Sequence, residues 1–123
     1  MLLFEECQEA LKDDFYIVEK SEEILSILQK YPMSQNAVLW SNINFIDFED
    51  MEELMKFLED KKDDRVYVVA DDASIPVFSS NLKLIIENIY DVIAICPKIY
   101  IFNDKLLLEP LFPSYKIRIG FNA

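Results

Sequence analysis

The fold is best predicted from residues 65–70, which read RVYVVA and are apolar at every position after Arg65. β-Branched and aromatic residues favour strands. A strand that is apolar on both faces is typical of the centre of a sheet. We therefore predict a central strand here, followed by a turn at the polar residues 71–74.

Upstream of this strand, the sequence predicts helices separated by short strands. Apolar residues recur at helical spacing in three segments, residues 2–11, 21–31 and 50–58. Ser21 is suited to cap the second helix, because its hydroxyl can accept a hydrogen bond from a free amide of the first turn. Asp50 with Glu53 has the spacing of a capping box at the start of the third helix. Strands are expected at residues 15–18, 37–40 and 43–46.

Downstream, Ser79 or Ser80 is expected to cap another amphipathic helix. Its buried face would consist of Leu82, Ile85, Ile86 and Ile89. The remaining strands are predicted at residues 92–96, 99–102, 106–108 and 115–121. Helices dominate the first two thirds and strands the last third, so we predict the fold class α+β. A single domain over residues 1–123 would have a mixed or antiparallel sheet with about three helices packed against it.

The charge is large, negative and uneven. The net charge is -11, and residues 1–72 hold 19 acidic residues against seven basic ones, whereas residues 73–123 hold four against five. Such a field repels nucleic-acid phosphates and anionic lipids and attracts cationic surfaces. We therefore expect a basic protein partner, with no direct binding to nucleic acid or membrane.

Several kinds of catalysis are excluded by residue counts. The chain has no histidine, one glycine and two cysteines. A Ser-His-Asp triad, an HExxH zinc site, a Gly-rich phosphate loop and a Cys-only zinc site are therefore impossible. We predict that the protein is not an enzyme and uses no cofactor or metal.

The location and the cysteines are predicted from apolar patterning. No stretch approaches the roughly 18 apolar residues of a membrane span, and no secretory signal precedes the first acidic residues. We therefore expect a cytoplasmic protein. Cys7 and Cys96 are then expected to be reduced thiols in the core.

The candidate partner-binding residues are acidic. Residues 47–64 hold nine acids and three lysines, and clustered like charges oppose folding unless they serve a function such as steering a partner. The predicted contact residues are Asp47, Glu49, Asp50, Glu52, Glu53, Asp60, Asp63, Asp64, Asp71 and Asp72. Possible aromatic anchors are Trp40, Tyr90 and Tyr100, each of which could instead belong to the core.

Two other functions stay open at this point. Asp71 and Asp72 follow a central strand, and with Asp47 or Asp91 they could hold Mg²⁺ in a carboxylate-dependent enzyme. A turn in which the aspartates cap local amides is the simpler interpretation. Alternatively, residues 115–121 could be an exposed edge strand of a generic adaptor that binds by β-augmentation.

The stretch VYVVADDASIPVFSSNL…IYDVIAICPKIYIFN, between residues 66 and 103, resembles the middle of some contact-dependent growth inhibition immunity proteins. In that family a strand ending in Asp-Asp is followed by a proline, a helix and a further strand pair. The resemblance implies a protein that binds and neutralises the C-terminal toxin domain of a surface effector, often a basic nuclease. It implies no particular binding residues.

Overall fold

The computed structural model describes residues 2–35 and 37–122. In these residues one antiparallel sheet of seven strands has the order β1-β6-β5-β7-β8-β9-β4. The strands are β1 (Tyr16–Ile17), β4 (Phe45–Phe48), β5 (Arg65–Ala70), β6 (Phe78–Asn81), β7 (Ile99–Phe102), β8 (Leu106–Pro110) and β9 (Ile117–Phe121). The α+β class and the central position of residues 65–70 are confirmed.

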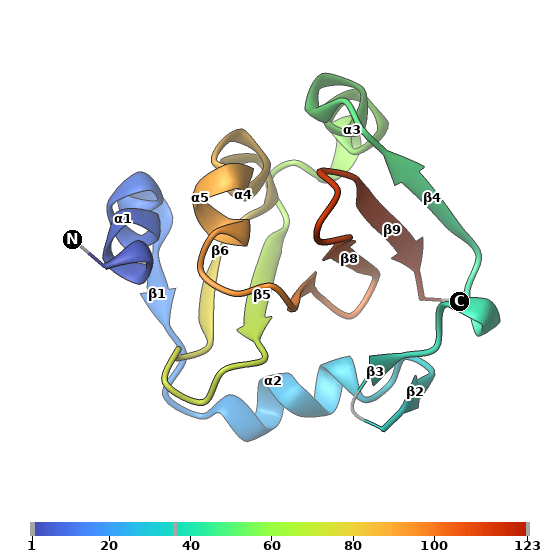
Figure 1. The fold of residues 1–123 in the computed structure, drawn as a ribbon, viewed down its shortest axis with the longest axis horizontal. Coiled ribbons are helices and arrows are strands. Elements are labelled where there is room, and N and C mark those ends of the chain that lie inside the picture. The colour runs from blue at the N-terminus through green and yellow to red at the C-terminus, as the bar shows by residue number, and fades with distance from the viewer. Residues whose placement is uncertain (1, 36, 123) are drawn as a thin grey trace.

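Helices cover both faces of this sheet (Figure 1). On one face lie α1 (Leu3–Ala10), α3 (Met51–Phe57), α4 (Leu82–Glu87) and α5 (Ile89–Ile93). On the other lie α2 (Ser21–Leu28) and a hairpin of β2 (Met33–Ser34) and β3 (Ala37–Val38). The short 3-10 turns are η1 (Lys12–Asp14), η2 (Trp40–Asn42) and η3 (Glu59–Lys61). The described part of the chain thus has five α-helices rather than about three.

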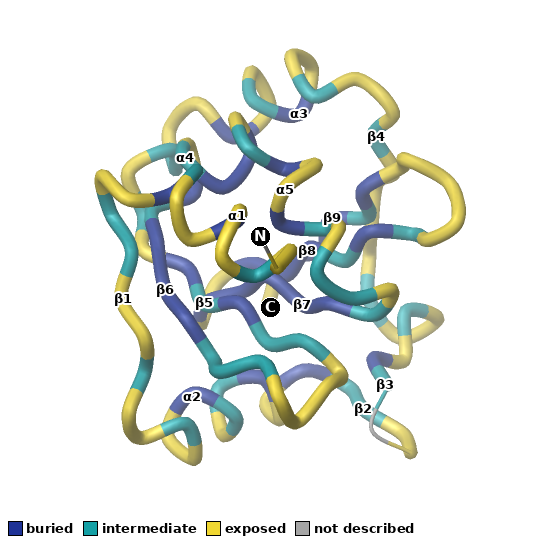
Figure 2. The backbone as a smooth tube through the Cα atoms, turned by 60° about the vertical axis from the view of Figure 1, so that its left-hand side comes forward, coloured by how far each residue is buried: buried dark blue, intermediate teal, exposed yellow. Residues whose placement is uncertain are grey.

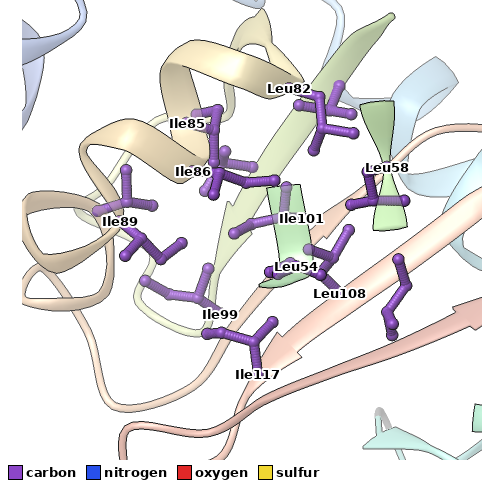
Figure 3. Packing of buried hydrophobic residues seen from close by; sticks show 14 of the residues in the cluster. Leu54, Leu58, Leu82, Ile85, Ile86, Ile89, Ile99, Ile101, Leu108 and Ile117 are labelled. Atoms are coloured by element: carbon purple, nitrogen blue, oxygen red, sulfur yellow. The ribbon is translucent and has the colours of Figure 1, made fainter. Parts of the chain in front are cut away.

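The strand residues alternate between two hydrophobic clusters. In β7, Ile99 and Ile101 join the cluster under α3, α4 and α5, while Tyr100 and Phe102 join the one under α2. Figure 3 shows residues of α4 and α5 packing onto strand residues of the first cluster. Figure 2 shows that β6 and β7 are largely buried, whereas the edge strand β1 is exposed. The central strands are therefore apolar on both sides because both sides are covered.

Two local predictions were wrong. Residues 92–96 were expected to be a strand, but Val92 lies in α5 and is buried, because it continues the helical spacing of Ile85 and Ile89. The cap of α4 is not Ser79 or Ser80, which are buried in β6. Asn81 caps it, with its side chain accepting a hydrogen bond of 2.8 Å from the Leu84 amide.

Three further predictions need correction. Ser21 is the first residue of α2, and its side chain makes no capping hydrogen bond. Asp50 does cap α3, but its carboxylate accepts a hydrogen bond of 2.8 Å from the Glu52 amide and not from the Glu53 amide, as a capping box would require. The strand at residues 117–121 is not an edge, since β9 pairs with β8 on one side and β4 on the other. The proposed adaptor edge at residues 115–121 is therefore absent.

Candidate protein-binding surface

Eight of the ten predicted contact residues lie in one continuous part of the fold, from β4 through α3 and η3 to the start of β5. This part of the molecule is at one end of the sheet (Figure 1). Asp71 and Asp72 follow the other end of β5. A six-residue strand rises roughly 20 Å, so these two aspartates are not brought together with the others.

Four of the nine acids in residues 47–64 are neutralised by cations of the chain itself. The ion pairs are Arg118–Asp47 at 2.8 Å, Lys116–Glu49 at 3.4 Å, Lys61–Asp60 at 3.0 Å and Lys62–Glu59 at 3.0 Å. Five acids have no cation within ion-pair distance among residues 2–35 and 37–122. We call these five the free acids: Asp50, Glu52, Glu53, Asp63 and Asp64. The negative field at this end is therefore smaller than the residue count suggests.

The Asp47–Arg118 pair belongs to a compact polar and aromatic node on the α2 face of the sheet. Arg118 donates from Nε and Nη2 to the two carboxylate oxygens of Asp47, at 2.8 and 3.1 Å. These hydrogen bonds and the guanidinium charge hold the pKa of Asp47 below its usual value, and the same hydrogen bonds and the carboxylate charge raise the pKa of Arg118. The guanidinium also lies 4.0 Å from the Phe45 ring centroid. Asp47 is therefore positioned to stabilise β4 against β9.

Trp40 completes this node. Its Nε1 donates to Glu109 Oε1 at 2.7 Å, and its ring contacts Phe45 edge to face, with 5.8 Å between centroids. Trp40 and Ile43 cross β9 at Gly120, where a Cβ would lie only 2.9 and 2.7 Å from their side chains. The one glycine of the sequence is thus required for close packing. Trp40 is a partly buried structural residue with one exposed side.

The other two predicted anchors differ from each other. Tyr100 is buried, and its hydroxyl accepts a hydrogen bond of 3.2 Å from the Val38 amide. It therefore belongs to the core. Tyr90 is exposed and contacts Tyr115 at 5.7 Å between ring centroids.

Tyr90 and Tyr115 lie at the mouth of an apolar groove of about 560 Å³ between α5 and the β8–β9 connection. Phe112 lines it and is exposed. Cys96 also lines it and is only partly buried, whereas Cys7 is fully buried in the core. The prediction of a core thiol thus holds fully for Cys7 and in part for Cys96, which packs against the core from a partly buried position.

Exposed apolar side chains adjoin the free acids on the α3 face. Ile46, Phe57 and Phe121 keep 48%, 40% and 39% of their surface exposed. The Phe57 ring contacts Phe48 and Phe121, with centroids 5.2 and 5.9 Å apart. We call Ile46, Phe57 and Phe121 the apolar patch. Sequence reasoning missed it, although Phe57 lies four residues after Glu53 and so on the same side of the helix.

The geometry at Asp71 and Asp72 is that of a turn. Asp72 Oδ1 accepts from the Ser74 amide at 2.9 Å and from its hydroxyl at 2.7 Å, and these hydrogen bonds lower the pKa of Asp72. No group of three or more metal-ligating side chains occurs among the residues that the structure describes. The local capping role is what the contacts support.

Three further findings come from the helices and from comparison with known proteins. No helix in the described ranges is long and apolar enough to cross a bilayer. A family model described as CdiI immunity protein, EcoliA0-like, matches residues 1–120. No curated protein sequence matches the chain.

Proposed function

The chain belongs to the CdiI immunity protein family, and we propose that it binds and neutralises the toxin domain of a contact-dependent growth inhibition effector. We further propose that this toxin is a basic nuclease. The protein would cover the active or substrate-binding surface of the toxin without catalysing a reaction. Because a nuclease acts inside the cell, we place this encounter in the cytoplasm.

The observation that carries this proposal is the combination of free acids and exposed apolar side chains at the α3 end of the sheet. Interfaces typically have an apolar, aromatic centre and a polar rim. The apolar patch provides such a centre, and the free acids provide a negative rim. A nuclease surface that grips phosphates is positive, so the two surfaces would be complementary.

The ten predicted contact residues have different roles in this proposal. Glu52 and Glu53 would meet cations of the toxin directly, since neither has an internal ion pair among the described residues. Asp63 and Asp64, which precede β5, would act at longer range. The paired and capping acids (Asp47, Glu49, Asp50 and Asp60) would contribute mainly to the shape of the surface. Asp71 and Asp72, at the far end of β5, would act only through long-range attraction.

The test is the binding of the toxin domain encoded beside this gene, measured by surface plasmon resonance at several salt concentrations. Steered association should slow by roughly tenfold or more between low and high salt, with a smaller change in dissociation. The double variant Glu52→Lys/Glu53→Lys should weaken affinity by about tenfold or more.

The matched control is Glu5→Lys/Glu6→Lys on α1, which changes the net charge equally but lies at the opposite edge of the helical layer (Figure 1). It should slow association moderately and leave dissociation unchanged. An association rate that does not depend on salt would refute the steering mechanism. Equal effects of the two double variants would place the contact away from α3.

A further inference from the structure

Strand β4 forms an open edge of the sheet. It pairs only with β9, and Figure 1 shows nothing along its outer side. Outside the β4–β9 ladder, no backbone hydrogen bond among the described residues involves Phe45–Phe48. Its outward amides and carbonyls are therefore available to another chain.

The register identifies which groups point outward. The Leu111 amide donates to the Lys116 carbonyl, and the Asn122 amide donates to the Lys105 carbonyl. The backbone N–H and C=O groups of the even-numbered residues of β9 therefore point toward β8. The odd-numbered residues then face β4, where Ile119 pairs with Ile46 and Ile117 with Phe48. The N–H and C=O groups of Phe45 and Asp47 consequently point away from the sheet.

This edge lacks the usual protection against pairing. Its sequence FIDF contains no lysine or proline, and its one charge, on Asp47, is paired with Arg118. Ile46 on one face and Phe45 on the other are both exposed. The opposite edge, β1, has only two residues, and short edges resist pairing. An unprotected apolar edge of this kind is a template on which another strand can pair.

Charge complementarity identifies the occupant. Asp50, Glu52 and Glu53 follow the end of β4 that leads into α3, so an added strand with basic residues would be attracted there. A second copy of this chain would instead bring another net charge of -11 and another set of free acids to the same place. Like charges at such an edge oppose pairing. The edge is thus suited to a cationic strand rather than to itself.

Resting on the function proposed above, we propose that an extended, basic segment of the toxin domain pairs with β4 as an eighth strand of the sheet. Its backbone would bond to the outward groups of Phe45 and Asp47. Alternate side chains would pack on the apolar patch on one face and on Phe45 and Trp40 on the other. Basic residues beyond the paired segment would meet the free acids.

Residue-level amide hydrogen exchange, measured by NMR on the ¹⁵N-labelled protein alone and in complex with the toxin domain, tests this directly. Alone, the amides of Phe45 and Asp47 should exchange fast, while those of Ile46 and Phe48 are protected by β9. In the complex, Phe45 and Asp47 should slow by at least tenfold. If the complex forms and these two amides still exchange fast, strand pairing is refuted and the proposed function stands.

If no complex forms, both proposals fail. If Phe45 and Asp47 become protected in the protein alone as its concentration rises, a second copy is the occupant and the assignment to the toxin is wrong. These outcomes require no variant, so they do not depend on how a substitution affects folding.

Variants provide an independent measurement. Phe45→Pro removes an outward amide, and Phe45→Ala removes the same side chain but keeps that amide. The Phe45→Pro variant should bind the toxin domain at least tenfold more weakly than the Phe45→Ala variant, because one carbonyl of the partner strand would lose its hydrogen-bond donor. Ile17→Pro is the control at the other edge, since Val18 bonds to Val77 and the Ile17 amide therefore points outward. Ile17→Pro should change the affinity for the toxin domain by less than about twofold. Equal affinities of the Phe45→Pro and Phe45→Ala variants would overturn the proposal.

Discussion

Replacing Gly120 with alanine should destabilise the protein through a defined steric conflict. The added Cβ would lie 2.7 Å from Ile43 Cγ2, 2.9 Å from Trp40 Cζ3 and 3.4 Å from the carbonyl oxygen of Asn44. The first two distances are well below van der Waals contact, and neither atom can move away easily. Ile43 is branched at Cβ, and the Trp40 ring is held by its hydrogen bond to Glu109.

The magnitude follows from two opposing effects. Overpacking of this kind costs about 1–3 kcal/mol. Alanine also restricts the unfolded chain more than glycine, which stabilises by about 0.4–1 kcal/mol. The net loss should be about 1–2 kcal/mol, which for a domain of this size lowers Tm by roughly 4–10 °C.

Urea unfolding followed by fluorescence is a suitable assay, because Trp40 is the only tryptophan and lies at the substituted site. Ile43→Ala removes the closest atom, so Gly120→Ala should cost about 1 kcal/mol less in that background than in the wild type. A double-mutant cycle measures this coupling. If Gly120→Ala is as stable as the wild type, or if the two substitutions are additive, the steric explanation is wrong.

Four other predictions concern individual side chains. Asn81→Ala should lose about 1–2 kcal/mol of stability, because it removes the cap of α4. Ser80→Ala should instead gain up to about 1 kcal/mol, because Ser80 Oγ is buried without a hydrogen-bond partner among the described residues. Urea unfolding checks both, and an Asn81→Ala variant as stable as the wild type would contradict the assigned cap. Burial raises the pKa of Cys7 to about 12, so a thiol reagent at pH 8 should modify Cys96 first, and equal rates would contradict the burial of Cys7. The pKa of Asp47 is lowered in the folded state, so the unfolded state binds more protons just below pH 4 and stability should fall as the pH decreases through the folded-state pKa. Asp47→Asn should make this loss of stability at acid pH smaller. If the dependence of stability on pH is unchanged in the variant, the ion pair contributes nothing.

The central strands could be predicted from the sequence because their composition has one simple cause. Residues 65–70 and 99–102 are apolar at successive positions, and the structure covers both faces of each. The order of the strands could not be predicted. It places β4 beside β9, far along the chain, and this pairing depends on contacts that no local pattern encodes.

The error at residues 92–96 has a physical explanation. The segment VIAIC has the β-branched composition of a strand, and propensity alone favours that assignment. In the structure, Ile89 and Val92 are buried three residues apart, so the helical spacing that began in α4 continues through α5. Burial against the sheet outweighs local preference here. The true cap at Asn81 was missed because two serines stand directly before it.

The candidate surface could be predicted only in part, because charge can be counted but its pairing cannot. Asp47 and Arg118 are 71 residues apart, and their contact follows from the β4–β9 register. Lys116 reaches Glu49 across the same strand pair. The basic residues of the C-terminal part thus neutralise part of the acidic segment, and sequence position alone gave no sign of this.

This partial neutralisation changes what the charge can do. With four of nine acids in residues 47–64 already paired, electrostatics would act mainly on the rate of encounter rather than on the strength of the final complex. Affinity and choice of partner must then come from contacts with fixed geometry. At the α3 end of the sheet, those contacts are the apolar patch and the open backbone of β4. Arg118 connects the two effects, because the ion pair that compensates the charge of Asp47 also holds β4, the edge strand on which we propose that the toxin pairs, against β9.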